Sequence, residues 1–125
     1  MKILCVDDDA SILEIIKAVL EDANYEVITA VNGLEGLELF KKHEAELGGI
    51  FLDLRMPGLD GISLLTKIRE TSSIPAVAVS AYLDKVRVGD CEKAGFNAHI
   101  NKPFDTIQFL DAARLIFVDP AAKKK

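Results

Sequence analysis

Side chains capable of chemistry follow four short apolar runs of this 125-residue sequence. Three consecutive aspartates, 7–9, come directly after the first run, and Asp53 ends a later one. Ser80 and Lys102 stand after two further runs. If these runs are neighbouring parallel strands, their carboxyl ends meet at the edge of the sheet where such folds place their binding crevice. The sequence therefore predicts one cleft that gathers carboxylates, a hydroxyl and an ammonium group.

This set of groups suits phosphoryl transfer assisted by a metal ion. Carboxylates gathered at one edge repel each other unless a cation lies between them. Oxygen ligands without His or Cys favour Mg²⁺ over zinc or copper. An aspartate beside such an ion can attack phosphorus as a nucleophile and form an aspartyl phosphate. A lysine would stabilise the negative phosphoryl oxygens, and a hydroxyl could hydrogen-bond the product.

The elements that must position these groups alternate along the chain. Apolar runs predict strands at 3–6, 27–30, 49–53, 76–79 and 98–100. Helical spacing of apolar residues predicts helices at 12–20, 34–40, 62–68, 84–94 and 104–117, the second opened by the capping pair Asn32 and Glu35. Strand and helix thus alternate five times, which predicts an α/β domain with helices on both faces of a parallel sheet. Near-continuous apolar strands are typical of such a sheet.

Composition narrows the classes of protein further. The net charge of −5 argues against direct nucleic-acid binding, which depends on Lys and Arg at phosphates. No apolar stretch approaches the roughly 20 residues that span a bilayer, so no membrane insertion is expected. Cys5 and Cys91 stand far apart and without metal-ligand spacing, which indicates two reduced thiols in a cytoplasmic protein without a secretory signal. We expect one domain over 1–118 and a solvated C-terminal tail over 119–125.

Several segments, in order along the chain, resemble the signature of the receiver domain of bacterial two-component response regulators. They read VDD at 6–8, LDLRMPGLDG at 52–61, VSA at 79–81, AGF at 94–96 and KPF at 102–104. The resemblance extends over about residues 3–117. Within the family, the chain is similar to the single-domain chemotaxis-type regulators. It implies a flavodoxin-like, doubly wound, five-stranded parallel sheet of order 2-1-3-4-5 with five helices.

The resemblance also implies a role for each acidic residue of the cleft. Asp53 would be the phosphoryl acceptor. Mg²⁺ would be bound directly by Asp8, by Asp53 and by the backbone carbonyl of Arg55. Asp7 would act mainly through a metal-bound water, whereas Asp9 reads better as a helix cap.

Further roles follow from the same resemblance. Lys102 would pair with the phosphoryl oxygens, and its peptide bond to Pro103 is typically cis in the family. Ser80 would turn inward as a switch residue and bind these oxygens after transfer. Tyr82 would shield the product from hydrolytic water, together with Arg55. The second switch position, three residues before the lysine, usually holds an aromatic ring; here it holds His99, which we expect to be partly buried.

The implied function is signalling rather than metabolic catalysis. The domain would take a phosphoryl group from the phosphohistidine of a sensor histidine kinase or phosphotransfer protein. It would then switch an interaction surface for a downstream protein target, on the fourth helix, fifth strand and fifth helix. Such a phosphoacceptor catalyses its own phosphorylation and dephosphorylation only.

Two other functions compete with this interpretation. A phosphohydrolase of the haloacid dehalogenase type would use Asp7, because Asp7-x-Asp9-x-Ser11 loosely imitates its nucleophile motif. The short chain and the better fit around Asp53 argue against it. A pseudo-receiver would keep the fold as an interaction module without phosphorylation. Identifying which aspartate becomes phosphorylated, Asp53 or Asp7, distinguishes these functions.

Overall fold

The computed structural model describes residues 1–81 and 85–120 of the chain. Its five strands are β1 (Lys2–Val6), β2 (Glu26–Ala30), β3 (Leu47–Asp53), β4 (Ala76–Ser80) and β5 (Ala98–Asn101). Its five helices are α1 (Ala10–Asp22), α2 (Gly33–His43), α3 (Gly61–Ile68), α4 (Lys85–Ala94) and α5 (Ile107–Leu115). The predicted alternation of strands and helices is confirmed.

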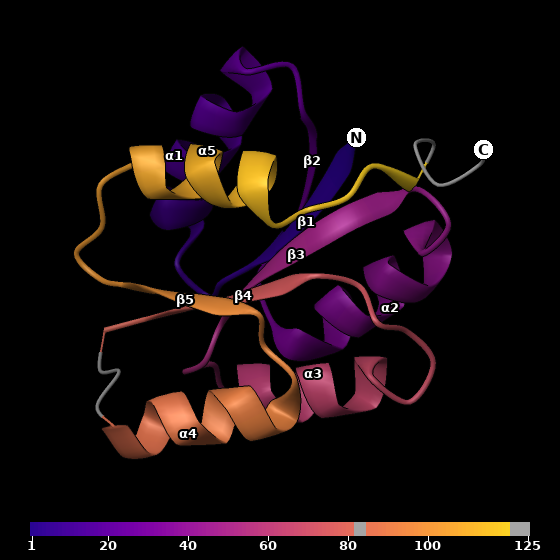
Figure 1. Ribbon diagram of the computed structural model, residues 1–125, viewed down its shortest axis with the longest axis vertical. Helices are drawn as coiled ribbons and strands as arrows, with labels where there is room; N and C mark the ends of the chain where they lie inside the picture. Colours follow the sequence, from indigo (N-terminus) through magenta and orange to yellow (C-terminus); the bar gives the residue numbers. More distant parts are fainter. Residues whose placement is uncertain (82–84, 121–125) are drawn as a thin grey trace.

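All strands are parallel and lie in the order β2-β1-β3-β4-β5, as the family resemblance implies. Helices α1 and α5 cover one face of this sheet, and α2, α3 and α4 cover the other (Figure 1). The order in which the chain adds strands to the sheet reverses between β1 and β3, and the candidate aspartates Asp7 and Asp53 lie at the carboxyl ends of these two strands. The doubly wound topology thus brings both aspartate-bearing strand ends together.

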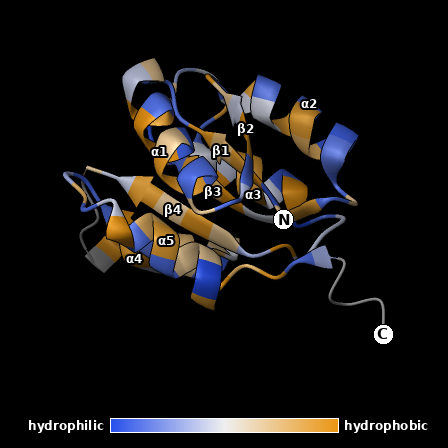
Figure 2. Cartoon of the chain, turned by 90° about the horizontal axis from the view of Figure 1, so that it is seen from above, coloured by the Kyte–Doolittle hydropathy of each residue, from blue (hydrophilic) through white to orange (hydrophobic). Residues whose placement is uncertain are grey.

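Two hydrophobic clusters hold the layers together, one on each face of the sheet. Phe51, in the central strand β3, packs its ring against Phe109 and Phe117, with ring centroids 4.9 Å apart in each pair. On the opposite face, Phe40 and Leu64 are buried under β1 and β3. Figure 2 shows that the helices carry both hydrophilic and hydrophobic stretches, whereas β4 is largely hydrophobic, as expected for a strand covered on both faces. The sheet is therefore a fixed platform for the groups at its carboxyl edge.

Capping residues determine where α1 and α2 begin. The Asp9 carboxylate accepts hydrogen bonds from the backbone N–H groups of Ser11 (2.9 Å) and Ile12 (3.3 Å), which confirms its predicted capping role. The Asn32 side chain accepts one from the Glu35 N–H at 2.8 Å, and the Glu35 side chain reaches back to the Val31 N–H at 2.9 Å. Both ends thereby satisfy N–H groups that a helix leaves without internal partners.

The observed elements begin or end one to three residues from their predicted bounds, and the differences at the last helix and at β3 have a clear structural cause. The last helix spans Ile107–Leu115 instead of 104–117. Asp105 caps its start by accepting from the Ile107 N–H at 3.1 Å, and Phe117 leaves the helix to pack on Phe51. Strand β3 begins at Leu47, two residues earlier than predicted, because Gly48 continues it, and a register shift between Lys2 and Ile3 accommodates Gly48 opposite β1. Glycines are weak strand signals in a sequence, so the early start was not apparent.

Further expectations concern the cysteines, membrane insertion, and residues that the structure does not describe. Both cysteines are free and buried, which agrees with two thiols that pack rather than pair. No helix within residues 1–81 and 85–120 is long and apolar enough to cross a membrane. The predicted roles of Tyr82, of Asp84 as the start of the fourth helix, and of the lysines at 123–125 lie outside the described residues. The division into a domain over 1–118 and a tail over 119–125 stays a prediction.

Candidate functional site

The strand order brings the predicted site residues to one edge of the sheet. Strand β1 pairs with β3 so that Val6 lies opposite Leu52, which places the residues following each, Asp7 and Asp53, side by side. Asp53 in turn lies opposite Val79, next to Ser80 at the end of β4. Pairing of β4 with β5 brings the chain to Lys102, whose N–H donates to the Ser80 carbonyl at 2.9 Å. Four strand ends thus supply one site, as the sequence predicts.

The two central aspartates are buried in spite of their charge. Asp7 is 2% exposed and Asp53 is 5% exposed, whereas Asp8 is exposed at the rim. The Asp7 Oδ1 accepts the Asp9 N–H at 2.9 Å, and the Asp53 Oδ1 accepts the Arg55 N–H at 3.2 Å. Backbone amides of the following loops therefore hold one oxygen of each carboxylate in place.

Lys102 supplies the positive charge between these carboxylates. Its Nζ lies 2.9 Å from the Asp7 Oδ2 and 3.4 Å from the Asp53 Oδ2. The lysine therefore bridges both aspartates, with the shorter contact to Asp7. The peptide bond from Lys102 to Pro103 is cis, as the family resemblance implies.

Burial and charge shift the titration of both partners. Burial first and the neighbouring Asp7 charge second raise the pKa of Asp53 to about 6, against the opposing effects of the Lys102 charge and the Arg55 N–H. Burial alone would lower the pKa of Lys102, but the hydrogen bonds and charges of Asp7 and Asp53 raise it overall. Lys102 is therefore an ammonium at neutral pH, while the Asp53 carboxylate lacks full compensation for its burial.

The three carboxylates suit a divalent metal ion. Ligand oxygens of Asp7, Asp8 and Asp53 all lie within 4.8 Å of one another. The ligands are oxygen atoms only, and Asp8 keeps one side accessible to solvent. Such a donor set fits Mg²⁺, which keeps several waters and binds through one or two carboxylates.

Ser80 and His99 differ in their surroundings. Ser80 is 2% exposed and ends β4 beside Asp53, in agreement with its predicted place. His99 is exposed, so the expectation of a partly buried histidine is wrong. Alternation along β5 explains the difference, because Ile100 points into the core against α1 and α5 while His99 points to the other side. There it lines a cavity of about 340 Å³ with Cys91 and Phe96, among others.

Two residues near the acceptor were not singled out by the sequence reasoning, Asp60 of the β3–α3 loop and Arg87 of α4. A cavity of about 430 Å³ beside this loop is lined by Arg55, Asp60 and Arg87, among others. Asp60 also caps α3 by accepting the Ser63 N–H at 2.8 Å. An aspartate just before an apolar-periodic segment, here the segment that starts at Ile62, is a helix-start signal that could have revealed this cap. Arg87 belongs to α4, and nothing in its spacing indicates that this helix faces the loop.

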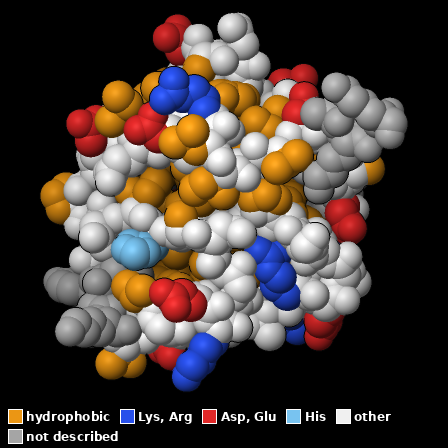
Figure 3. All heavy atoms as spheres, in the orientation of Figure 1, with side chains coloured by type: hydrophobic (Ala, Val, Ile, Leu, Met, Phe, Trp, Pro, Cys, Tyr) orange, Lys and Arg blue, Asp and Glu red, His pale blue; other side chains and the backbone are white. Residues whose placement is uncertain are grey.

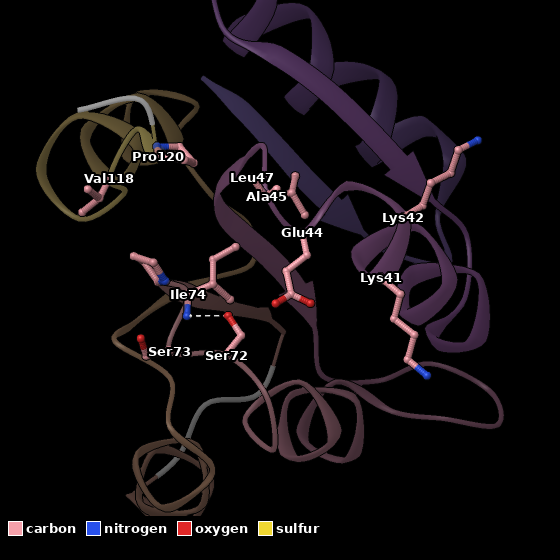
Figure 4. Close-up of a pocket in the computed structure, with 11 residues that line it drawn as sticks. Lys41, Lys42, Glu44, Ala45, Leu47, Ser72, Ser73, Ile74, Val118 and Pro120 are labelled. Atoms are coloured by element: carbon pink, nitrogen blue, oxygen red, sulfur yellow. Dashed lines mark hydrogen bonds between the residues drawn. The ribbon is translucent and has the colours of Figure 1, made fainter. Parts of the chain in front are cut away.

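A further cavity lies at the opposite end of the sheet (Figure 4). Its volume is about 440 Å³, and its lining includes Leu47 at the start of β3 and Pro75 just before β4. Figure 4 shows the Glu44 carboxylate directed toward the Ser72–Ile74 side, whereas Lys42 points away from it. The length of β3 separates this cavity from Asp53, so it takes no part in the acidic site.

Known proteins share these features. The model of the response regulator receiver domain family matches residues 3–114. Sporulation initiation phosphotransferase F of Bacillus subtilis is 31% identical over 114 residues, which is 90% of both chains. The transcriptional regulatory protein CseB of Streptomyces avermitilis is 37% identical over 103 residues, or 82% of this chain. The chain spans only 43% of the length of that longer regulator.

Solved structures agree with the sequence comparison. The chemotaxis protein CheY4 of Vibrio cholerae superimposes with a TM-score of 0.84 at 28% identity, covering 90% of this chain and 95% of that one. CheY of Borrelia burgdorferi, in a structure of a CheX–CheY–BeF3–Mg complex, gives a TM-score of 0.85 at 27% identity, covering 92% and 90%. With the fold, the strand-end acids and the family match in agreement, the chain belongs to the response regulator receiver domains, the phosphoacceptor switches of two-component signalling.

Proposed function

We propose that Asp53 is the residue that accepts the phosphoryl group, and that the donor is the phosphohistidine of a sensor histidine kinase or phosphotransfer protein. The observation that carries this proposal is the position of the Lys102 ammonium, 3.4 Å from the Asp53 carboxylate in a site shared with Asp7 and Asp8. A buried nucleophile beside a fixed cation suits a reaction that gathers negative charge on phosphoryl oxygens.

The transfer exchanges one bond to phosphorus for another. An oxygen of the Asp53 carboxylate attacks the phosphorus while the bond from phosphorus to the donor's imidazole nitrogen breaks. The electron pair stays on that nitrogen, and the product is an aspartyl phosphate. Because Lys102 is already held at the site by Asp7 at 2.9 Å, its charge needs little reorganisation as the phosphoryl group arrives. The domain thereby catalyses its own phosphorylation and, with water as acceptor, its own dephosphorylation.

The metal ion that we propose is Mg²⁺, held by Asp8, Asp53 and the backbone carbonyl of Arg55. The Asp7 carboxylate is the closer partner of the Lys102 ammonium, at 2.9 Å against 3.4 Å for Asp53. This arrangement supports an indirect role for Asp7, through a water. When bound, Mg²⁺ would neutralise the acidic cluster and the charge of the transferred group.

Phosphorylation would act on the surface of α4, β5 and α5, with Ser80 and His99 as its switch residues. Ser80 adjoins the acceptor, and His99 lies exposed on the next strand. Hydrophobic side chains gather on this side of the molecule, in the region between α5 and α4 (Figure 3). A downstream protein that recognises this surface would sense the rearrangement of Ser80 through the paired strands β4 and β5.

We place this function in the cytoplasm, in a domain over 1–118 with the remaining residues as a tail. The relatives differ in length, since the chain covers 90% of the phosphotransferase but 43% of the transcriptional regulator. The function that we propose therefore includes a downstream protein partner. It includes neither direct binding to nucleic acid nor insertion into a membrane.

The test is to identify the modified residue. The protein is incubated with acetyl phosphate and Mg²⁺ and examined by intact-mass and peptide mass spectrometry. We expect a gain of one phosphoryl group on Asp53, lost in Asp53→Asn and in excess chelator. Modification of Asp7, with Asp53→Asn still reactive, would instead support the dehalogenase-type hydrolase. No modification of the wild-type protein by acetyl phosphate or by any kinase of the source organism would support a pseudo-receiver.

A further inference from the structure

Gly61 makes an unusually close approach to the backbone of the acceptor. It is the first residue of α3 and follows the capping residue Asp60. A Cβ atom at this position would overlap the carbonyl oxygen of Asp53 and lie 3.0 Å from the Leu54 Cα. Cβ atoms essentially never come this close to backbone atoms, so only glycine allows α3 to begin here without a shift.

This close contact at Gly61 brings the two ends of the β3–α3 loop together. The Gly61 N–H donates to the Leu54 carbonyl at 3.3 Å, which joins the start of α3 to the end of β3. Moving helix α3 away from this contact would cost free energy, because its Leu64 and Leu65 side chains are completely buried in the core. A side chain at Gly61 would therefore push on the end of the strand as well as on the helix.

The Asp53 carboxylate is sensitive to such a push. Its contacts with the Arg55 N–H and the Lys102 Nζ measure 3.2 and 3.4 Å, near the upper limit for hydrogen bonds. A shift of a few tenths of an ångström would break them and turn the nucleophile away from Lys102. A misplacement of about 1 Å is enough to cost roughly a hundredfold in rate.

We propose that Gly61 is a positioning residue, whose missing side chain sets the direction of the Asp53 carboxylate. It does so through the backbone contact between α3 and the end of β3. This inference rests on the proposed role of Asp53, but it concerns a residue that touches neither donor nor metal ion. It assigns to the glycine a specific effect on phosphorylation, beyond its effect on stability.

The experiment compares Gly61→Ala with Gly49→Ala. Gly49 also lies in a crowded place on β3, where a Cβ would overlap the Phe117 ring, but it is at the far end of the strand from Asp53. Both substitutions should lower the melting temperature. Phosphorylation by acetyl phosphate with Mg²⁺ is then measured at 15 °C with sucrose as stabiliser, and each rate is divided by the folded fraction from circular dichroism.

We expect Gly61→Ala to be phosphorylated about tenfold more slowly per folded molecule or worse, and Gly49→Ala within twofold of wild type. A second readout needs no phosphorylation. The Arg55 amide resonance in a ¹⁵N spectrum of the metal-free protein should move in Gly61→Ala and stay in place in Gly49→Ala, because this amide donates to Asp53.

Equal rates per folded molecule for the two variants would overturn the inference. So would an unmoved Arg55 amide, or a Gly61→Ala protein that stays unfolded under these conditions, because the glycine would then serve folding alone. If wild-type Asp53 accepts no phosphoryl group at all, the proposed function fails. The amide resonance still decides whether Gly61 positions the carboxylate.

Discussion

At the scale of single residues, Asp53 combines burial with incomplete charge compensation. The carboxylate is 5% exposed, and it shares the Lys102 ammonium with Asp7, which lies closer to that lysine. Burial and the Asp7 charge therefore raise its pKa to about 6. The same features that make Asp53 a suitable nucleophile and metal ligand make its ionised form unfavourable in the metal-free protein.

This pKa predicts how the stability of the metal-free protein depends on pH. In the unfolded chain the Asp53 carboxyl returns to its ordinary pKa of 3.8. The folded state thus holds the proton more tightly, a stabilisation that is complete below pH 3.8 and lost as the pH rises through about 6. Urea unfolding in chelator should give a free energy about 1 kcal/mol higher at pH 5 than at pH 7.5.

The Asp53→Asn variant is the control for this measurement, since it lacks the titrating group but keeps the shape of the side chain. Its unfolding free energy should change less between the two pH values than that of the wild type. The same pH dependence in both proteins would assign the effect to titratable groups other than Asp53.

At the scale of secondary-structure elements, one arginine joins three of them. The Arg69 guanidinium, at the end of α3, donates to the Gly95 carbonyl at 2.7 Å and to the Ser72 carbonyl at 3.2 Å. It also donates to the Oδ1 atom of the Asn97 side chain at 3.4 Å. The same oxygen accepts a hydrogen bond from the Ala76 N–H of β4 at 2.9 Å. This cluster fixes the C-terminal end of α4 against α3 and β4, whereas the other end of α4 follows the loop after Ser80.

We predict that Arg69→Met destabilises the protein by about 2 kcal/mol, because it leaves carbonyl groups without a charged donor. Arg69→Lys should restore part of the loss, since an ammonium can reach one carbonyl but cannot bridge several. The measurement is urea unfolding of the two variants and the wild type. A loss below 0.5 kcal/mol for Arg69→Met, on the order expected of an ordinary surface substitution, would contradict the role of the cluster.

At the scale of the whole molecule, binding of the proposed metal ion would be coupled to folding. The acidic cluster forms only when the ends of β1 and β3 lie side by side, so an ion that binds it binds the folded state alone. Mg²⁺ at about ten times its dissociation constant should then add about 1.4 kcal/mol to the unfolding free energy and raise the melting temperature by a few degrees.

Asp8→Ala provides the matched variant for this prediction. It should remove the Mg²⁺-dependent rise in melting temperature. In the metal-free protein the same substitution should be neutral or stabilising, because it removes one charge from a repulsive group whose oxygens lie within 4.8 Å. Differential scanning calorimetry with and without Mg²⁺ measures both effects. Clear destabilisation of the metal-free variant would mean that Asp8 supports the fold.

Three features could be predicted from local sequence patterns: the order of the elements, the position of the acidic residues after β1 and β3, and the capping roles of Asp9 and Asn32. These features depend on local spacing of apolar residues and on side chains next to helix ends, which a sequence displays directly. The family resemblance added the strand order and the cis bond before Pro103, both present in the structure. Local patterns thus predicted that the acidic residues lie at one edge of the sheet.

The arrangement of the side chains within that edge depends on packing that no local pattern displays. Lys102 is closer to Asp7 than to Asp53, His99 faces solvent rather than the core, and Gly61 lies against the Asp53 carbonyl. Each of these depends on groups distant in sequence, because the packing of α3 on β3, or the register of β5 on β4, sets the direction of a side chain. Strand-end spacing predicts which residues share a site; the contacts between layers decide which of them touch.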